Sequence, residues 1–95
     1  MEFEWNDWKA KENLRRHGIS FSEASTVFSD FLSSTIPDPL HSEAEERLVT
    51  LGCSEQQRLL VVVHTERGDV IRSISARKAT THERKNYEQS NARPT

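Results

Sequence analysis

The 95 residues suffice for one domain, and 34% apolar with 29% charged residues predict a small core outside the range of disordered chains. The single cysteine excludes an internal disulfide and a cysteine-based metal site, and no apolar run approaches the about 18 residues of a transmembrane helix. The net charge of −2 argues weakly against binding of nucleic acid by the chain as a whole.

The first predicted elements are a short strand and a helix. Residues 3–5 form the strand, and Asn6 then caps a helix over residues 7–17. Gly18 supplies the left-handed residue on which helices commonly end. The acidic N-terminus lacks the basic and then apolar layout of a signal peptide, so we expect a cytoplasmic protein without membrane contact.

A second helix is predicted directly after this stop. The sequence SFSE at Ser20–Glu23 has the pattern of a capping box and opens a helix that we expect to reach Asp30. Its apolar residues recur at helical spacing, which predicts that they enter the core. They are Phe21, Ala24, Val27, Phe28 and Phe31.

The remaining predicted elements are strands followed by one helix. The strands cover residues 33–36, 47–53, 58–65 and 70–77, with an acidic loop over residues 38–45 and a last helix capped at Thr80 and ending near Gln89. This order predicts an α+β fold in which two N-terminal helices cover one face of a twisted antiparallel meander of three or four strands. The C-terminal helix lies at an edge or on the other face. We expect one domain over residues 1–90 and a frayed tail over residues 91–95.

Charge is distributed unevenly along this order. The balance is −2 over residues 1–37, −4 over residues 38–57 and +4 over residues 58–95. The local field matters more to a polyanion than the net charge does, so the C-terminal part suits a phosphate-bearing partner. A solvated basic face is the alternative interpretation.

Polar residues recur on the first helix and on the last hairpin. Lys9, Asn13 and His17 are spaced by four and share one helix face, which is either solvated or aimed at a phosphate. The hairpin carries four further polar residues on or beside its strands, namely His64, Thr65, Arg72 and Arg77. Arginine suits phosphate because its guanidinium is a rigid fork of donors.

The face that each hairpin residue occupies depends on the pairing register. If Thr65 faces Val70, then His64 shares a face with Arg77, whereas a shift by one residue places His64 beside Arg72. The sequence does not fix the register, but both alternatives put a histidine on one face with an arginine.

Two further polar pairs complete the set of candidates. Glu46 precedes Arg47 at the start of a strand and would orient an arginine or act as a base, while Glu83 and Tyr87 share one face of the last helix. Tyr87 would donate to a phosphate or stack on a base. Surface ion pairing and edge packing are the alternatives for these residues.

No metal, nucleotide or nucleophile-elbow motif accompanies these residues. The sequence has no HExxH, zinc spacing, P-loop, GxSxG or GxGxxG pattern. Histidine, arginine, lysine, glutamate and tyrosine suffice for metal-free RNA cleavage without a cofactor, in which the 2′-hydroxyl of the RNA attacks the adjacent phosphorus. DNA lacks this internal nucleophile, so the mechanism selects RNA.

Three stretches of the chain resemble one protein family. They are FEWNDWKAKENLRRHGISFSEA at residues 3–24, IPDPLHSEAEERLVTLG at residues 36–52 and LLVVVHTERGDVIRSISARKATTHERKNYE at residues 59–88. In this order they resemble BrnT-type toxins, the ribonucleases of type II toxin–antitoxin systems. The chain departs from the usual pattern at Asn6 and Asp7, where the family commonly has Asp and Pro. It also departs at Trp8, which is bulkier than the residue expected there and would be a core residue or an antitoxin contact.

The resemblance implies a RelE-like fold and a metal-free ribonuclease activity that arrests translation. It also implies a BrnA-type antitoxin that carries a DNA-binding domain, a heterotetramer with it, and contact with operator DNA only through this partner. The recurring polar residues of the family fall on Lys9, Asn13, His17, Glu46, Arg47, His64, Thr65, Arg72, Arg77, Glu83 and Tyr87.

The hypothesis that follows assigns a role to each candidate. Arg72 and Arg77 hold the scissile phosphate, His64 is the acid or base, and Lys9 and His17 supply further charge or proton transfer. Asn13, Arg47, Thr65 and Tyr87 would contact the substrate, supported by Glu46 and Glu83. The alternative is a non-enzymatic module that acts mainly as co-repressor with a DNA-binding antitoxin. DNA binding by this chain itself ranks lower, because no helix has the dense basic surface of a recognition helix.

Overall fold

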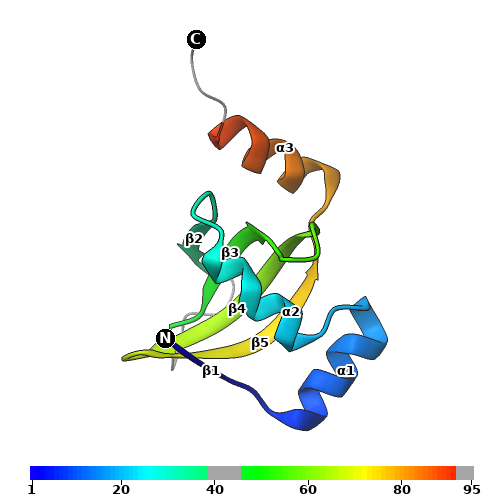
Figure 1. Cartoon of the computed structure of the whole chain (residues 1–95), viewed down its shortest axis with the longest axis vertical. Coiled ribbons are helices and arrows are strands. Elements are labelled where there is room, and N and C mark those ends of the chain that lie inside the picture. Colours follow the sequence, from blue (N-terminus) through cyan, green and yellow to red (C-terminus); the bar gives the residue numbers. More distant parts are fainter. Residues whose placement is uncertain (39–45, 92–95) are drawn as a thin grey trace.

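The computed structural model describes residues 1–38 and 46–91 and shows an α+β fold built on one five-stranded sheet (Figure 1). Most of the predicted acidic loop and of the predicted frayed tail lies outside the described residues. The elements in chain order are β1 (Glu2–Glu4), α1 (Asp7–His17), α2 (Phe21–Ser25), the 3-10 helix η1 (Thr26–Ser29), β2 (Ser34–Pro37), β3 (Leu48–Cys53), β4 (Leu59–Arg67), β5 (Val70–Lys78) and α3 (Thr81–Ser90). No helix in this described part has the length and apolar character needed to cross a membrane.

The predicted limits of α1 are confirmed by its caps. The Asn6 side chain accepts a hydrogen bond from the Lys9 amide at 3.0 Å. Gly18 has a φ of 71° and donates its N–H to the Leu14 carbonyl, so the helix ends where a residue with a side chain would be strained. Local chemistry therefore sets both ends of this helix.

The second helix is shorter than predicted, and its capping box is only half formed. Ser20 accepts from the Glu23 amide, but the Glu23 carboxylate turns away to bind Arg58 and Ser54 instead of returning to the cap. The helix ends at Ser25, and η1 completes the predicted span to Ser29. The prediction that Phe31 enters the core is wrong, because it lies beyond η1 and is 96% exposed.

The prediction of a purely antiparallel sheet is also wrong. Strands β2 to β5 form the expected antiparallel meander, but β1 adds to the far side of β5 in parallel and gives the order β1-β5-β4-β3-β2. Phe3 is the inward-facing residue of β1 and packs on the ring of Phe28, with 5.6 Å between the centroids. This packing helps to hold β1 beside Val70–Arg72, at the turn end of the hairpin formed by β4 and β5.

The hairpin register differs from both alternatives considered for the sequence. A two-residue turn pairs Arg67 with Val70, so Thr65 faces Arg72 and His64 faces Ser73. The pairing then shifts, since Val63 faces Ser75 and Ile74 is left as the extra residue of a β-bulge. Paired residues point to the same side, and side chains alternate along β4. Arg72 and Arg77 consequently lie on the face opposite His64, and the expectation that His64 shares a face with an arginine is wrong.

We call the two sides of the sheet the helix face and the far face. The helix face is covered by α2 and η1 (Figure 1) and holds the buried core. The core residues are Ile19, Phe21, Ala24, Val27, Leu60, Val62 and Ala76. The far face carries the alternate residues of the same strands, among them Val61, Val63 and Arg77. The helices α1 and α3 contribute side chains to the hollows described below.

Candidate functional site

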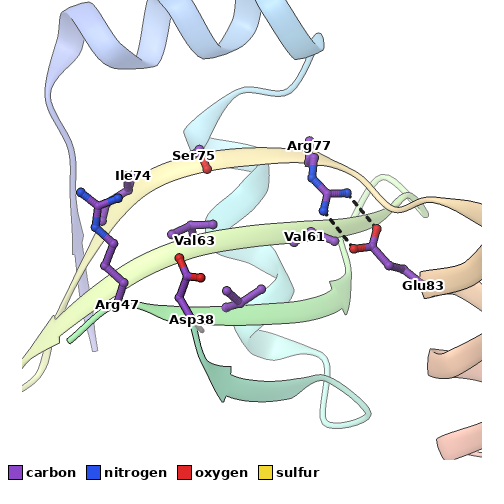
Figure 2. Close-up of a pocket in the computed structure, with 9 residues that line it drawn as sticks. Asp38, Arg47, Val61, Val63, Ile74, Ser75, Arg77 and Glu83 are labelled. Carbon is purple, nitrogen blue, oxygen red and sulfur yellow. Dashed lines mark hydrogen bonds and ion pairs between the residues drawn. The ribbon is translucent and has the colours of Figure 1, made fainter. Parts of the chain in front are cut away.

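A hollow of about 320 Å³ lies on the far face, between the strands β3 to β5 and the start of α3. Its apolar lining is Val49, Val61, Val63 and Ile74, and its polar lining is Asp38, Arg47, Ser75, Arg77 and Glu83. Figure 2 shows Arg47 at one end, the Arg77–Glu83 pair at the other, and Asp38 between them. We call this the first hollow; it brings two of the predicted arginines together on one side of the sheet.

The Arg77 guanidinium has a fixed orientation in the first hollow. It donates two hydrogen bonds to the Glu83 carboxylate, at 2.8 and 2.9 Å, and a third to the Lys78 carbonyl at 3.2 Å. The same carboxylate accepts from the Thr80 amide and completes the capping box of α3. Hydrogen bonding to Arg77 lowers the pKa of Glu83 to about 2, while the carboxylate raises the pKa of Arg77. Three of the five guanidinium N–H groups are thus engaged, and two remain to face a ligand.

Arg47 has a different character at the opposite end. It immediately precedes β3, is half-buried, and its backbone carbonyl accepts from the Asp38 amide. Within residues 1–38 and 46–91, no hydrogen bond or ion pair engages its guanidinium. Its neighbour Glu46 is exposed and does not line the hollow, so no contact among the described residues supports the role predicted for Glu46.

A second hollow of about 220 Å³ lies where α1 meets β5. It is lined by Trp8, Lys9, Glu12, Asn13, Arg16, His17, Ile74 and Ser75. Ile74 and Ser75 line both hollows, so the two adjoin across the bulge of β5. The predicted row of Lys9 and His17 on α1 therefore borders the same surface as Arg47 and Arg77.

Asn13, the middle residue of that row, has a structural role. Its amide donates to the carbonyls of Ile19 and Ala76 at 2.9 and 2.8 Å and accepts from the Ala76 amide at 3.0 Å. Strand β1 pairs with β5 only at Val70–Arg72. At Ala76, further along β5, the side chain of Asn13 forms the backbone hydrogen bonds that a neighbouring strand would form. With 6% of its surface exposed, Asn13 holds α1 to the sheet and has no free group for a substrate.

His64 lies outside both hollows, in the core on the helix face. It is fully buried, its Nε2 shares a 2.7 Å hydrogen bond with the Thr50 hydroxyl, and its ring packs edge-on against Phe28. Burial lowers the pKa of His64 to about 4, so the ring is neutral at pH 7. This position does not bring the imidazole to Arg77.

Three further candidates are also placed away from the hollows. Arg72 pairs with Glu4 of β1 at 3.3 Å, and Thr65 opposite it is 2% exposed. Tyr87 donates to the Asp30 carboxylate at 2.7 Å, which anchors α3 to the turn after η1. Burial, together with this bond, raises the pKa of Tyr87 to about 12. These contacts hold the fold together and leave the first hollow to other residues.

The burial of His64 gives a pH dependence of stability. Its pKa is lowered below the ordinary value of 6.5, so the unfolded chain takes up a proton first. The contribution of the neutral, buried His64 ring to the free energy of unfolding is complete above pH 6.5 and is lost as the pH falls toward 4. From the size of this shift we expect the free energy of unfolding to drop by about 2 kcal/mol between pH 7 and pH 5.

Urea unfolding at the two pH values checks this expectation. His64→Gln keeps a donor for Thr50 but has no group that titrates, so it should remove most of the drop. The matched control is His82→Gln, on the exposed face of α3. This variant should show the same drop in the free energy of unfolding as the wild type. An unchanged drop in His64→Gln would contradict the assignment.

Sequence reasoning missed four polar residues that line these hollows. Asp38 lies in the first hollow, Glu12 and Arg16 lie in the second, and Ser75 lines both. The single usable signal was the spacing of Arg16 from Trp8 and Glu12, which places the three on one face of α1.

Among the described residues, no group of three or more histidine, cysteine or acidic side chains is arranged to hold a metal ion.

Comparisons with known proteins found a matching family and a similar solved structure. Residues 5–83 match the model of the family described as "Ribonuclease toxin, BrnT, of type II toxin-antitoxin system". The crystal structure of the Brucella abortus ribonuclease toxin BrnT is similar to this chain, with 26% sequence identity and a TM-score of 0.65. The similarity covers 85% of this chain and 99% of that chain. None of the curated proteins matches the chain.

Proposed function

Because the chain belongs to the BrnT family of ribonuclease toxins of type II toxin–antitoxin systems, we propose that it cleaves RNA and thereby arrests translation in the cytoplasm. The cleavage site is the first hollow together with the second. The family supports the proposed activity, and the contacts described above support the choice of residues.

The observation that carries this assignment is the pair of arginines at the two ends of the first hollow. Arg77 is oriented by Glu83 with two N–H groups left over, and Arg47 has a guanidinium without a described partner. Two such cations, on the two sides of an apolar floor, suit the charge that builds up on a phosphate during cleavage. His64 is buried in the core and Arg72 lines neither hollow, so neither residue has this role.

The chemistry we propose requires no metal. The 2′-hydroxyl of the RNA attacks the adjacent phosphorus, its proton passes to a base, and an acid protonates the leaving 5′-oxygen. The first hollow has two carboxylates, of which Glu83 is bound by Arg77, and we assign the other, Asp38, as the base. His17 and Lys9 of the second hollow supply the acid and further positive charge.

The partner that we propose is a BrnA-type antitoxin with a DNA-binding domain. It neutralises the toxin in a heterotetramer, and the complex represses its own operon, so that this chain meets operator DNA only through the antitoxin. We also propose that the chain has the RelE-like fold that the resemblance implies. Both proposals rest on the resemblance to the family and on its description as a type II system.

The test is incubation of the purified protein with RNA in EDTA, with and without antitoxin. Cleavage that persists in EDTA and stops with antitoxin supports the proposal. A strict metal requirement contradicts the mechanism. Expression without growth arrest, together with no cleavage, favours the alternative of a non-enzymatic co-repressor.

A further inference from the structure

Trp8 lines the second hollow without entering the core. Its side chain is 69% exposed in the first turn of α1. The neighbouring Trp5 behaves differently, since it packs edge-on against Phe21 at 6.1 Å and joins the core. An indole that is left exposed beside a hollow has no packing role there and is available to a ligand.

The charges around Trp8 suit a polyanion. Lys9, Arg16 and His17 line the same hollow. The one acidic residue of the lining, Glu12, is bound to Arg15 by two hydrogen bonds of 3.1 and 2.8 Å, which lower the pKa of Glu12. Its negative charge is therefore matched by an arginine outside the hollow, and the hollow keeps the positive charge of Lys9 and Arg16.

The helix geometry keeps this group of residues together. Trp8, Glu12 and Arg16 are spaced by four and share one face of α1, next to the row that holds Lys9 and His17. Ile74 and Ser75 connect this hollow to the first hollow. A phosphate bound in the first hollow thus has the aromatic ring on the adjoining surface.

We propose that Trp8 stacks on a base of the RNA next to the scissile phosphate, so that this chain acts on single-stranded RNA. The proposal rests on the function proposed above and adds the form of the substrate. Stacking needs an exposed base face, which a single strand offers and a duplex hides within its own stack. Positive charge beside an exposed aromatic ring is the combination by which proteins hold single strands. Every nucleotide of RNA has a phosphate anion, so Lys9 and Arg16 suit RNA as the occupant of this hollow.

The experiment uses tryptophan fluorescence and a single-stranded RNA that cannot be cleaved. Oligo(A) and oligo(U) with 2′-O-methyl riboses lack the internal nucleophile, so binding is measured alone. We expect quenching in the wild type and weaker binding of Trp8→Ala by about 5- to 160-fold, the range that one stacked base provides. Trp8→Phe should keep part of the affinity, and the duplex of the two oligonucleotides should bind without quenching.

The matched control is Phe31→Ala, which removes an exposed aromatic ring that lines neither hollow. It should bind as the wild type does, and a thermal melt confirms that each variant is folded. Equal affinity of Trp8→Ala and wild type overturns the inference. So does a loss of antitoxin binding with unchanged RNA binding, which would assign Trp8 to the protein interface. Binding that depends on Trp8, without cleavage of unmodified RNA by the wild type, would refute the proposed function and leave only the stacking of Trp8 on single-stranded RNA standing.

Discussion

Replacing Arg47 by alanine is expected to lower the rate of RNA cleavage about 100-fold or more, the usual effect of losing one charged donor to a transition state. Its guanidinium lines the first hollow and has no described partner, so its removal takes away phosphate binding without breaking an ion pair. Cleavage of a labelled oligonucleotide under single-turnover conditions measures the effect. Growth arrest on expression should be lost in parallel.

Two further variants make the Arg47 result specific. Arg84→Ala removes the same charge from the exposed side of α3, outside both hollows, and should cleave as the wild type does. Arg47→Lys should restore part of the rate, since lysine keeps the charge but not the fork of donors. Cleavage by Arg47→Ala at the rate of Arg84→Ala would exclude Arg47 from the site.

Arg77 needs a different comparison because it also has a structural partner. Arg77→Ala leaves the Glu83 carboxylate without its bidentate partner, so a loss of activity would mix phosphate binding with a loosened α3. For this reason Arg47 is the sharper probe of the first hollow.

Asn13→Ala is expected to lower the free energy of unfolding by about 3 kcal/mol, because three buried hydrogen bonds disappear and the N–H and C=O of Ala76 lose their partner. Urea unfolding measures the change. Asn13→Asp should recover none of the loss, since its second carboxylate oxygen would be buried against the carbonyls of Ile19 and Ala76 without a proton to donate. Asn86→Ala on the exposed face of α3 is the matched control and should change stability by less than about 0.5 kcal/mol.

The same variant separates the structural role of Asn13 from the predicted contact with substrate. At a temperature where Asn13→Ala is folded, its KM for RNA should equal that of the wild type. A raised KM with unchanged stability would show that the side chain faces the substrate after all.

The local elements were predictable because their signals act within a few residues. Asn6 and Gly18 set the ends of α1, and Thr80 with Glu83 sets the start of α3, through hydrogen bonds that span three or four residues. The short second helix was not predictable in the same way. Its capping carboxylate, Glu23, is taken by Arg58, a partner 35 residues away.

The candidate site was predicted in its residue types and only partly in its positions. Lys9, His17, Arg47, Arg77 and Glu83 line the two hollows. His64 and Tyr87 lie outside them in structural contacts, and Asn13 borders the second hollow with its amide bound to the backbone. A polar residue in a lean core and a polar residue in a binding site look alike in sequence. The contacts of each side chain distinguish them, and these contacts are long-range.

The sequence by itself determined the α+β order of elements, the helix caps, the basic C-terminal part and the resemblance to ribonuclease toxins. The tertiary structure alone decided which polar residues meet. The bulge at Ile74 shifts the pairing by one residue, because Val63 faces Ser75 while His64 faces Ser73. Strand side chains alternate between the two faces, so His64 lies on the helix face with Leu60 and Val62, whereas the shift in β5 places Arg77 opposite Val61 on the far face.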